Sequence, residues 1–408
     1  MADTLAGPVP EATDTVPEFP MSREARCPFD PPPALKDLQA EAPLTKVRLW
    51  DGSEPWLVTR YTEQRAILGD ARVSADIDTP GYPNKAASGG GKLSFIMMDD
   101  PEHARLRRMA TAPFAIKRVE AMRPTVQKIV DDLIDDLLAG PGPVDLVDAF
   151  ALPIPSLVIC ELLGVPYDDH AMFQDNTKTM VRTTSTTEER NAATRVIGGY
   201  LGGLIGQRLA EPQDDLLSSI AGRVAAGELT HGQATEMALL LLFAGHETTA
   251  NMIALGTLAL LQNPDQLALL RETDDPKVVA SAVEELLRYL NIAHEGKRRA
   301  VTEDIEIAGQ VLKAGDGVIL VNEIANRDPE VFADPDKLDI TRDARRHVAF
   351  GFGIHQCLGQ PLARMELQVV YGTLYKRIPT LKLACALEDV KFKHDAFIYG
   401  VHGLPVTW

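Results

Sequence analysis

Apolar residues recur at steps of three and four positions through most of the chain, a spacing typical of amphipathic helices. The clearest such segments span residues 61–69, 126–138, 151–164 and 194–209. A longer stretch, 234–262, is apolar around most of its circumference, which predicts a helix buried inside the protein. We therefore expect a mainly helical protein with one long central helix.

Strand-like patterns are shorter and fewer. Residues 47–50 and 56–60 flank an Asp-Gly dipeptide and predict a β-hairpin, although their connection is longer than the ideal two residues. Residues 305–307 and 318–321 predict further strands, as does sequence near the C-terminus. The fold class that we expect is mainly α with small β-sheets.

The first twenty residues differ in composition from the rest. Residues 1–20 are rich in proline and small polar residues, which predicts a disordered N-terminal arm. They lack the basic start and apolar core of a signal peptide, and also the roughly 20 apolar residues of a membrane anchor. No internal repeat or linker divides residues 21–408, so we expect one large domain there.

Composition narrows the possible partners. The 408 residues carry a formal net charge of -17, which argues against nucleic-acid binding and favours solubility. Apolar residues make up 45% of the chain, enough for a sizeable core. The cysteines are far apart and form no CxxC pair, which predicts neither a disulfide framework nor a zinc site. They are Cys27, Cys160, Cys357 and Cys385. We expect a cytoplasmic protein, a monomer without a membrane partner.

A glycine-rich stretch, Ser-Gly-Gly-Gly-Lys at 88–92, has some likeness to a phosphate-binding loop. That motif needs glycine where Ala86 stands and serine or threonine where Leu93 stands, so the sequence does not predict a P-loop. We expect a surface loop instead, one that covers a pocket.

The candidate chemistry centres on residues 350–359, which read FGFGIHQCLG. Gly351 and Gly353 allow sharp turns and a close approach to a flat partner. A helix is predicted to start near Leu358, so the Cys357 thiol would lie where backbone N–H groups and the helix dipole lower its pKa. A thiolate among glycines suits an axial ligand of haem iron. The alternative is an inert, buried cysteine in a turn.

These residues resemble the haem-ligand loop of the cytochrome P450 superfamily, Phe-x-x-Gly-x-basic-x-Cys-x-Gly. The matching positions are Phe350, Gly353, His355, Cys357 and Gly359. The resemblance covers nearly all of residues 21–408 and is closest to soluble bacterial hydroxylases of the actinobacterial type. It implies the cytochrome P450 fold, with the long central helix over a haem b. It also implies that Cys357 ligates the iron and that Gly351 and the other loop residues contact the cofactor.

The middle of the long helix reads Ala-Gly-His-Glu-Thr-Thr, and polar residues in a buried helix need a reason. Small Ala244 and Gly245 would leave room for the cofactor. The Thr248 hydroxyl can bond the Ala244 carbonyl, which tends to bend or open a helix. The family has an acid–alcohol pair here, so the resemblance implies that Glu247 delivers protons and Thr248 binds water or dioxygen. His246 is expected only to pack or to form a hydrogen bond. The alternative is a kinked core helix with satisfied hydroxyls.

Glu285 and Arg288 lie one helical turn apart, a spacing that commonly gives a surface ion pair. The resemblance implies instead that this pair is buried, that Arg342 completes it and that all three residues brace the haem loop. We assign them a structural role.

Four residues resemble the family's contacts to the haem propionates, which need cationic or hydrogen-bonding partners when buried. They are His103, Arg107, Arg299 and His355. Taken singly, each could be a solvated surface charge. Lys297 and Arg298 adjoin Arg299, so either of them could occupy its place.

The resemblance implies a monooxygenase that hydroxylates or epoxidises its substrate with dioxygen and two electrons. No reductase domain is fused, so the electrons are expected from NAD(P)H through a ferredoxin reductase and a ferredoxin. Four arginines near the cysteine loop would form a basic patch for an acidic ferredoxin. They are Arg108, Arg345, Arg346 and Arg364. Two alternatives stay open: a nitric oxide reductase, which sequence around 51–59 resembles, and a non-catalytic haem sensor.

The substrate pocket is expected from variable segments near 83–95 and 177–187 and from the inner face of the central helix. Four further residues belong to it, Ile292, Ala293, Phe397 and Ile398, with Glu295 adding one acid. This mixture predicts a fairly large, mainly apolar organic molecule with some polar groups, from secondary metabolism or xenobiotic oxidation. It does not separate a macrolide, a peptide, a terpenoid and a steroid-like compound.

Overall fold

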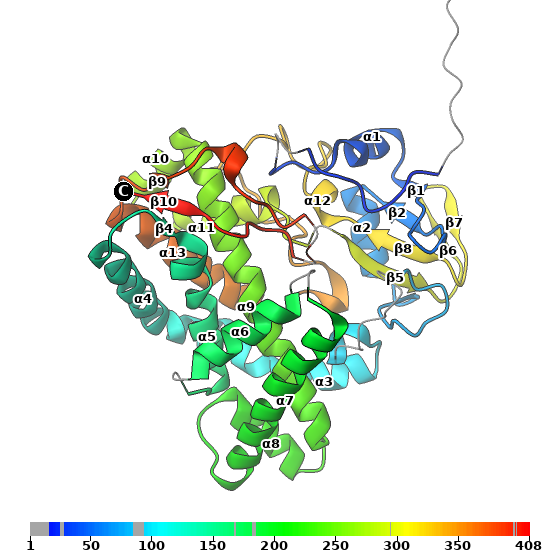
Figure 1. Ribbon diagram of the computed structural model, residues 1–408. Coiled ribbons are helices and arrows are strands. Elements are labelled where there is room, and N and C mark those ends of the chain that lie inside the picture. Colours follow the sequence, from blue (N-terminus) through cyan, green and yellow to red (C-terminus); the bar gives the residue numbers. More distant parts are fainter. Residues whose placement is uncertain are drawn as a thin grey trace, which may run out of the picture.

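The computed structural model describes residues 16–24, 28–84, 94–166, 169–181, 185–293, 295–394, 396 and 398–408. Helices form most of the molecule, and a sheet of short strands lies at one side of them (Figure 1). This sheet brings residues 44–74 together with residues 297–320. The predicted fold class, mainly α with small sheets, is confirmed.

The helices follow the predicted apolar spacing. They are α1 (Pro33–Glu41), α2 (Tyr61–Leu68), α3 (Glu102–Thr111), α4 (Ile116–Ala139), α5 (Pro153–Leu163), α6 (His170–Val181), α7 (Thr187–Ala210), α8 (Leu216–Ala225), α9 (His231–Gln262), α10 (Pro264–Glu272), α11 (Pro276–Tyr289), α12 (Asn322–Ala325) and α13 (Gln360–Arg377). The last of these, α13, begins two residues after the predicted start, with Gly359 at its N-cap and Pro361 in its first turn.

The strands form three small sheets. Their bounds are β1 (Leu44–Lys46), β2 (Trp56–Val58), β3 (Val73–Ser74), β4 (Val144–Asp145), β5 (Lys297–Val301), β6 (Ile305–Ile307), β7 (Gln310–Leu312), β8 (Gly317–Leu320), β9 (Lys382–Leu383) and β10 (Pro405–Thr407). The largest sheet has the order β1-β2-β8-β5-β3, in which β2 and β8 run parallel. The strands β4, β10 and β9 make a second sheet, and β6 and β7 make a hairpin.

The central helix is α9. Its N-terminus is a capping box, in which Thr230 accepts from the Gln233 N–H and the Gln233 side chain accepts from the Thr230 N–H. This cap places the start at His231, three residues before the prediction. The helix packs against α5, α7, α8 and α13 (Figure 1). It is long and apolar enough to span a membrane, but 72% of its most apolar window is buried within the protein, as in a core helix.

The first hairpin is shifted from its predicted position. Its first strand is β1 at Leu44–Lys46 rather than 47–50, and Lys46 lies opposite Trp56. On its other edge, Trp56 pairs with Val318 of β8. The neighbouring strand therefore fixes the register of β2, and the Asp-Gly turn lies inside a longer connection.

The predicted disordered arm extends too far. Residues 1–15 lie outside the described part of the chain, but residues 16–20 pack on the body. The Phe19 N–H donates to the Arg48 carbonyl at 2.9 Å, and the Phe19 ring is buried with Leu35 and Val47. One buried aromatic ring therefore orders this proline-rich segment. The glycine-rich stretch at 88–92 also lies outside the described residues.

Candidate functional site

The loop that carries Cys357 turns on two glycines in left-handed conformations. Gly351 has φ of +75° and Gly353 has φ of +74°. A Cβ atom on Gly353 would lie 2.2 Å from the carbonyl oxygen of Leu68, so the loop lies directly against the end of α2. The Cys357 N–H donates to the Phe350 carbonyl at 2.8 Å and closes the turn.

The Cys357 side chain has exposed surface although it lies deep in the protein, because that surface opens onto an internal cavity. Ala244, Gly245 and Thr248 of α9 line the same cavity, as does Glu366 of α13. Burial raises the pKa of the Cys357 thiol, and the Gly359 N–H and nearby cations oppose this shift only in part. The predicted lowering by the helix terminus is therefore outweighed. A coordinated metal ion deprotonates a thiol through its own charge.

Helix α9 presents its polar centre to this cavity. The Thr248 hydroxyl donates to the Ala244 carbonyl at 2.7 Å, the contact expected from the sequence. The helix nevertheless runs without interruption from His231 to Gln262. A Cβ atom on Gly245 would lie 3.0 Å from Ile159, so this glycine also allows α5 to pack closely on α9. His246 is buried, with its Nδ1 3.0 Å from the Thr177 hydroxyl.

Glu247 is buried beside Thr248 and is held by two partners that the sequence did not predict. Its Oε1 accepts from the Asn251 side chain at 2.9 Å and pairs with the Lys393 ammonium at 3.0 Å. Asn251 lies four positions along α9, a spacing that could have identified it. No local pattern points to Lys393, because it comes from a distant part of the chain.

The predicted propionate contacts converge near the cysteine loop. The rings of His103 and His355 lie 4.2 Å apart, and the Nε2 atom of each is buried without a hydrogen-bond partner among the described residues. Burial, followed by the charges of Arg299, His103 and Arg107, lowers the pKa of His355 to about 3. Arg107 also donates to the Gln356 carbonyl at 2.5 Å. With this pKa the His355 ring is neutral near pH 7, so Arg107 and Arg299 supply the positive charge here, and an anion would offset it.

Strand alternation separates the three consecutive cations at the start of β5. Arg298 points away from this cluster and donates to the Pro83 carbonyl at 3.3 Å. Lys297 and Arg299 share the other face. Burial and the charge of Arg299 lower the pKa of Lys297 to about 8, while Cys357 raises it. Lys297 is therefore a neighbour of the cysteine loop. The sequence indicated it only as an alternative to Arg299.

These features fit a haem. A single thiol faces a cavity roofed by the small residues of α9, as an axial ligand requires. Two histidines with unsatisfied Nε2 atoms and two arginines lie at one edge, where a pair of carboxylates would supply the missing partners.

The brace behind the cysteine loop is assembled from residues far apart in sequence. Arg288 donates to both carboxylate oxygens of Glu285, at 2.7 and 2.8 Å, and both side chains are fully buried. Arg342 reaches the same carboxylate at 3.2 Å. Arg288 also donates to three backbone carbonyls, those of Asn326, Pro335 and Lys337. The arrangement ties α11 to the segment that leads into the loop.

The four arginines of the predicted docking patch differ in their surroundings. Arg108 is exposed on α3, and Arg346 is exposed with one bond to the Val331 carbonyl. Arg345 pairs with exposed Asp343 at 2.8 Å. Arg364 instead makes a two-pronged ion pair with Glu284, at 2.6 and 3.1 Å.

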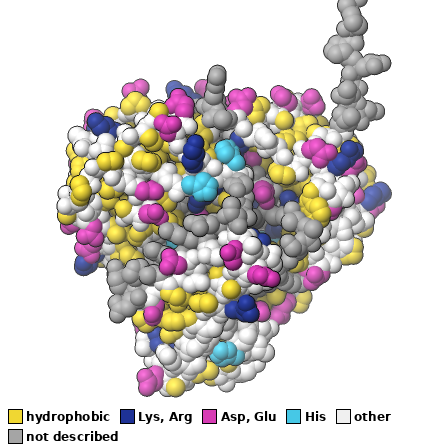
Figure 2. Space-filling view, viewed as in Figure 1, with side chains coloured by type: hydrophobic (Ala, Val, Ile, Leu, Met, Phe, Trp, Pro, Cys, Tyr) yellow, Lys and Arg dark blue, Asp and Glu magenta, His cyan; other side chains and the backbone are white. Residues whose placement is uncertain are grey.

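Glu284 is a second brace that the sequence did not predict. Burial favours its neutral form, but hydrogen bonds and charges from His347 and Arg364 outweigh that effect and lower its pKa to about 2. The charge of Arg364 is therefore largely neutralised, as that of Arg345 is by Asp343, and Arg108 and Arg346 are left to face a partner. Acidic side chains are spread over the face of the molecule shown in Figure 2, in keeping with the net charge of -17.

The predicted substrate residues are only partly described. Ile398 is buried, and Ile292 accepts a hydrogen bond from the Tyr399 N–H at 2.7 Å, so these two segments lie side by side. Ala293 accepts from the Asn291 side chain at 2.8 Å. Phe397 lies outside the described residues.

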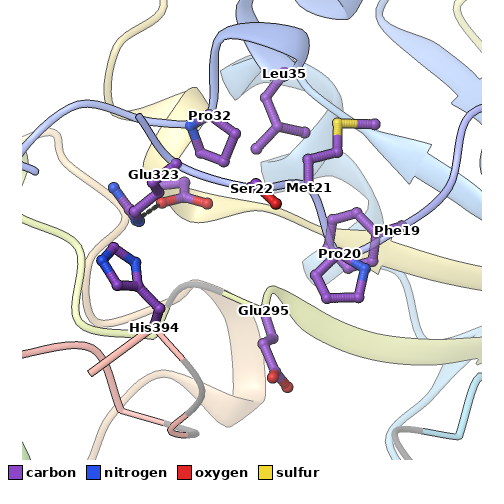
Figure 3. Close-up of a pocket in the computed structure, with 10 residues that line it drawn as sticks. Phe19, Pro20, Met21, Ser22, Pro32, Leu35, Glu295, Glu323 and His394 are labelled. Carbon is purple, nitrogen blue, oxygen red and sulfur yellow. Dashed lines mark hydrogen bonds and ion pairs between the residues drawn. The ribbon is translucent and has the colours of Figure 1, made fainter. Parts of the chain in front are cut away.

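A separate pocket of about 340 Å³ lies between the N-terminal segment and the start of β5. Phe19, Pro20, Glu295 and His394 are among its lining residues (Figure 3). Its wall holds a buried ion pair between Glu323 of α12 and Arg23. Burial raises the pKa of Glu323 to about 7, although the charges of Arg23 and Arg327 act against that shift.

Known proteins share this architecture over nearly all of the chain. The family model described as Cytochrome P450 matches residues 207–378. Cytochrome P450 GfsF of Streptomyces halstedii is 53% identical over 414 residues, covering 100% of both chains. Its crystal structure matches with a TM-score of 0.92 over 96% of this chain and 100% of that one.

Two further relatives carry names that describe an activity. The vitamin D3 dihydroxylase of Streptomyces griseolus is 45% identical over 414 residues, covering 100% of both chains. The crystal structure of the mycinamicin VIII C21 methyl hydroxylase MycCI from Micromonospora griseorubida, bound to mycinamicin VIII, is 41% identical with a TM-score of 0.89. It covers 96% of this chain and 100% of that one. The present chain therefore belongs to the cytochrome P450 family and is a haem-dependent monooxygenase.

Proposed function

We propose that this monooxygenase hydroxylates a large, mainly apolar organic molecule, and that its proton supply passes Glu247 and Thr248. One observation carries the proposal: Thr248 lines the cavity that contains the Cys357 thiol, and a buried carboxylate adjoins it directly on α9. The substrate class draws support from relatives named for vitamin D3 and mycinamicin VIII.

The haem, when bound, supplies the activation of dioxygen and the insertion of an oxygen atom into a C–H bond. Cys357 would hold its iron, and His103, Arg107, Arg299 and His355 would hold its carboxylates. The small side chain of Ala244 leaves space over the thiol. The cavity is mainly apolar, which excludes bulk water from the reacting centre.

The alcohol and the acid have distinct tasks. The Thr248 hydroxyl donates its hydrogen bond to the Ala244 carbonyl. Its oxygen can still accept a hydrogen bond from a group in the cavity. Glu247 is buried next to it, so its carboxylate can store a proton away from solvent. Together they pass protons one at a time toward the cavity.

The Thr248→Ala variant tests this assignment. We expect haem loading to persist, but electrons should be consumed with hydrogen peroxide as the main product, because the hydroxyl that directs the proton is missing. Thr248→Ser is the matched control and should retain coupling. A compound that shifts the ferric haem spectrum would first be chosen from a panel of macrolides and secosteroids. Tight coupling in Thr248→Ala would contradict the role.

We infer that the electrons come from NAD(P)H through a ferredoxin reductase and an acidic ferredoxin that docks beside the cysteine loop. Arg108 and Arg346 are exposed there, and Arg107 on the same helix contacts that loop. The double variant Arg108→Glu/Arg346→Glu should slow ferredoxin-driven reduction, most strongly at low ionic strength. Arg195→Glu/Lys382→Glu makes the same charge change at exposed positions elsewhere and should not. Equal reduction rates in both double variants would rule out this surface.

We also infer that the protein acts as a cytoplasmic monomer in one domain. The acidic charge and the burial of α9 inside the body support a soluble protein. Sedimentation of the purified protein would test the monomer.

A further inference from the structure

Near the C-terminus, residues 391–393 and 400–402 pair as the two arms of a hairpin. The Lys393 N–H donates to the Gly400 carbonyl at 2.9 Å, and the His402 N–H donates to the Lys391 carbonyl at 2.8 Å. Phe392 and Val401 face each other between these two contacts. Lys393 therefore lies directly opposite Gly400, close to the tip of the hairpin.

This hairpin lies against α9 at the level of Glu247. The Lys393 ammonium is 3.0 Å from Glu247 Oε1 and 3.1 Å from the amide oxygen of Asn251. A Cβ atom on Gly400 would lie 1.7 Å from that same amide oxygen, so only glycine permits this approach. The hairpin and α9 thus share one hydrogen-bonded cluster with little freedom to slide.

The cluster fixes the carboxylate rather than merely covering it. Asn251 donates to both the side chain and the backbone carbonyl of Glu247, at 2.9 and 2.8 Å. Lys393 donates to the acid and to the amide oxygen. Of the residues that the structure describes, Lys393 is the one lysine or arginine whose side chain lies within 4 Å of the Glu247 carboxylate. A buried carboxylate with one cationic partner depends strongly on that partner.

Next to Gly400, the same hairpin reaches a segment that is proposed to contact substrate. Ile398 belongs to it, and the Tyr399 N–H donates to the Ile292 carbonyl at 2.7 Å. A molecule bound against Ile292 and Ile398 would therefore contact the backbone segment that leads to Gly400. Gly400 in turn faces Lys393 and Asn251.

We propose that Lys393 is a positioning residue that sets the orientation of the Glu247 carboxylate. Through it, the C-terminal hairpin makes proton delivery depend on substrate occupancy. This inference rests on the proposed role of Glu247. While Lys393 and Gly400 keep their contacts with Glu247 and Asn251, the acid holds this orientation, and displacement of residues 398–400 by a bound molecule frees the carboxylate to turn toward Thr248. Among the described residues, those that line the cavity of Cys357 do not include Lys393, so the lysine acts through the acid.

The test compares four variants in the haem-loaded enzyme, Lys393→Met, Lys393→Arg, Glu247→Gln and the double variant Lys393→Met/Glu247→Gln. The exposed lysine on the same hairpin gives the control, Lys391→Met. The probe is a compound that shifts the ferric haem spectrum. The measurements are peroxide released per electron pair, the solvent isotope effect on turnover, and amide hydrogen exchange over residues 391–402 in the resting protein.

We expect Lys393→Met to lower coupled turnover by about tenfold or more and to change the solvent isotope effect. Lys393→Arg should restore much of both, because it keeps the cation. The double variant should behave as Glu247→Gln alone, since Lys393 acts only through that acid. Exchange over the hairpin should be faster in Lys393→Met, and the probe should slow it in the unmodified protein. Lys391→Met should change none of these quantities.

Several results would overturn the inference. If Lys393→Met and Glu247→Gln reduce coupling additively, the lysine does not act through Glu247 and its role is only structural. If Glu247→Gln uncouples the enzyme while Lys393→Met does not, the positioning role alone fails. If Glu247→Gln leaves coupling intact, the proposed proton route fails and this inference with it. Should Lys393→Met not fold, Lys393→Gln replaces it with the same expectations.

Discussion

The conformation of one residue, Gly353, controls whether the cysteine loop can close. Its φ of +74° is one that side-chain-bearing residues adopt at a cost, and its α-carbon faces the Leu68 carbonyl. The two constraints are separate, because one is intrinsic to the backbone and the other arises from packing against α2.

Substitution of this glycine should reveal both costs. Gly309, in the turn between β6 and β7, has the same φ of +74° but nothing within 4 Å of its Cβ position. Gly309→Ala should lower the free energy of unfolding by about 1–2 kcal/mol, the backbone cost alone. Gly353→Ala should lower it clearly more, with loss of bound haem, since the new methyl would lie 2.2 Å from a carbonyl oxygen. Urea unfolding and haem content would measure this. Equal costs at the two positions would contradict the packing argument.

At this scale the sequence predicted residues that act through a short motif. The cysteine loop, the acid–alcohol pair and the Glu285–Arg288 spacing are all local patterns, and the structure brings each together. It did not predict the pairing of Lys393 with Glu247 or that of Arg364 with Glu284. The residues of the first pair are 146 positions apart, and those of the second pair are 80 positions apart. Long-range ion pairs depend on how helices pack, and no periodicity along the chain encodes that.

A glycine in the interior of α9 allows that helix to pack closely against α13. Gly256 of α9 faces Tyr371 of α13, and a Cβ atom there would lie 2.0 Å from the tyrosine oxygen. That hydroxyl donates to the Met252 carbonyl at 2.5 Å. The glycine is therefore a packing requirement between two helices that flank the site.

The same substitution should have opposite effects at two helical glycines. Gly222→Ala in α8, where nothing lies within 4 Å of the Cβ position, should raise the free energy of unfolding by up to about 1 kcal/mol. Gly256→Ala should lower it by about 1–3 kcal/mol because the methyl displaces Tyr371. Thermal and urea unfolding would report both values. The coupling is tested by adding Tyr371→Phe, which should be less costly in the Gly256→Ala background than alone. Stabilisation by Gly256→Ala would refute this packing account.

Element types were predicted better than element boundaries. The apolar spacing identified α4, α5, α7 and α9, but the capping box at Thr230 and the long N-terminal half of α4 were missed. The hairpin shift at β1 has a different cause, since β2 takes its register from β8. Caps are local and could have been identified, whereas register is a property of the assembled sheet.

For the molecule as a whole, the buried Glu323 links stability to pH. Its pKa is about 7 in the folded protein against 4.5 for an ordinary glutamate, so the folded state binds more protons between these values. Stability must therefore fall as pH rises from about 4.5 to about 7, by up to about 3 kcal/mol from this group.

The Glu323→Gln variant should flatten that part of the stability curve. Urea midpoints measured from about pH 5 to about pH 8 should decline less steeply in the variant, because no proton is lost on ionisation. Glu303→Gln, at an exposed carboxyl, serves as the control and should follow the unmodified protein. If stability declines with pH as steeply in Glu323→Gln as in the unmodified protein, the Glu323 carboxyl has the same pKa in the folded and unfolded states.

The parallel pairing of β2 with β8 also constrains how the chain is made. Trp56 hydrogen-bonds to Asp316, 260 positions later, so the first strands leave the ribosome on the order of tens of seconds before their partners exist. The cysteine loop is synthesised later still. An apolar edge therefore waits unpaired in the nascent chain, and cofactor capture can only follow the near-completion of synthesis. Slowing translation late in the message should lengthen that vulnerable interval and raise the fraction lost to aggregation.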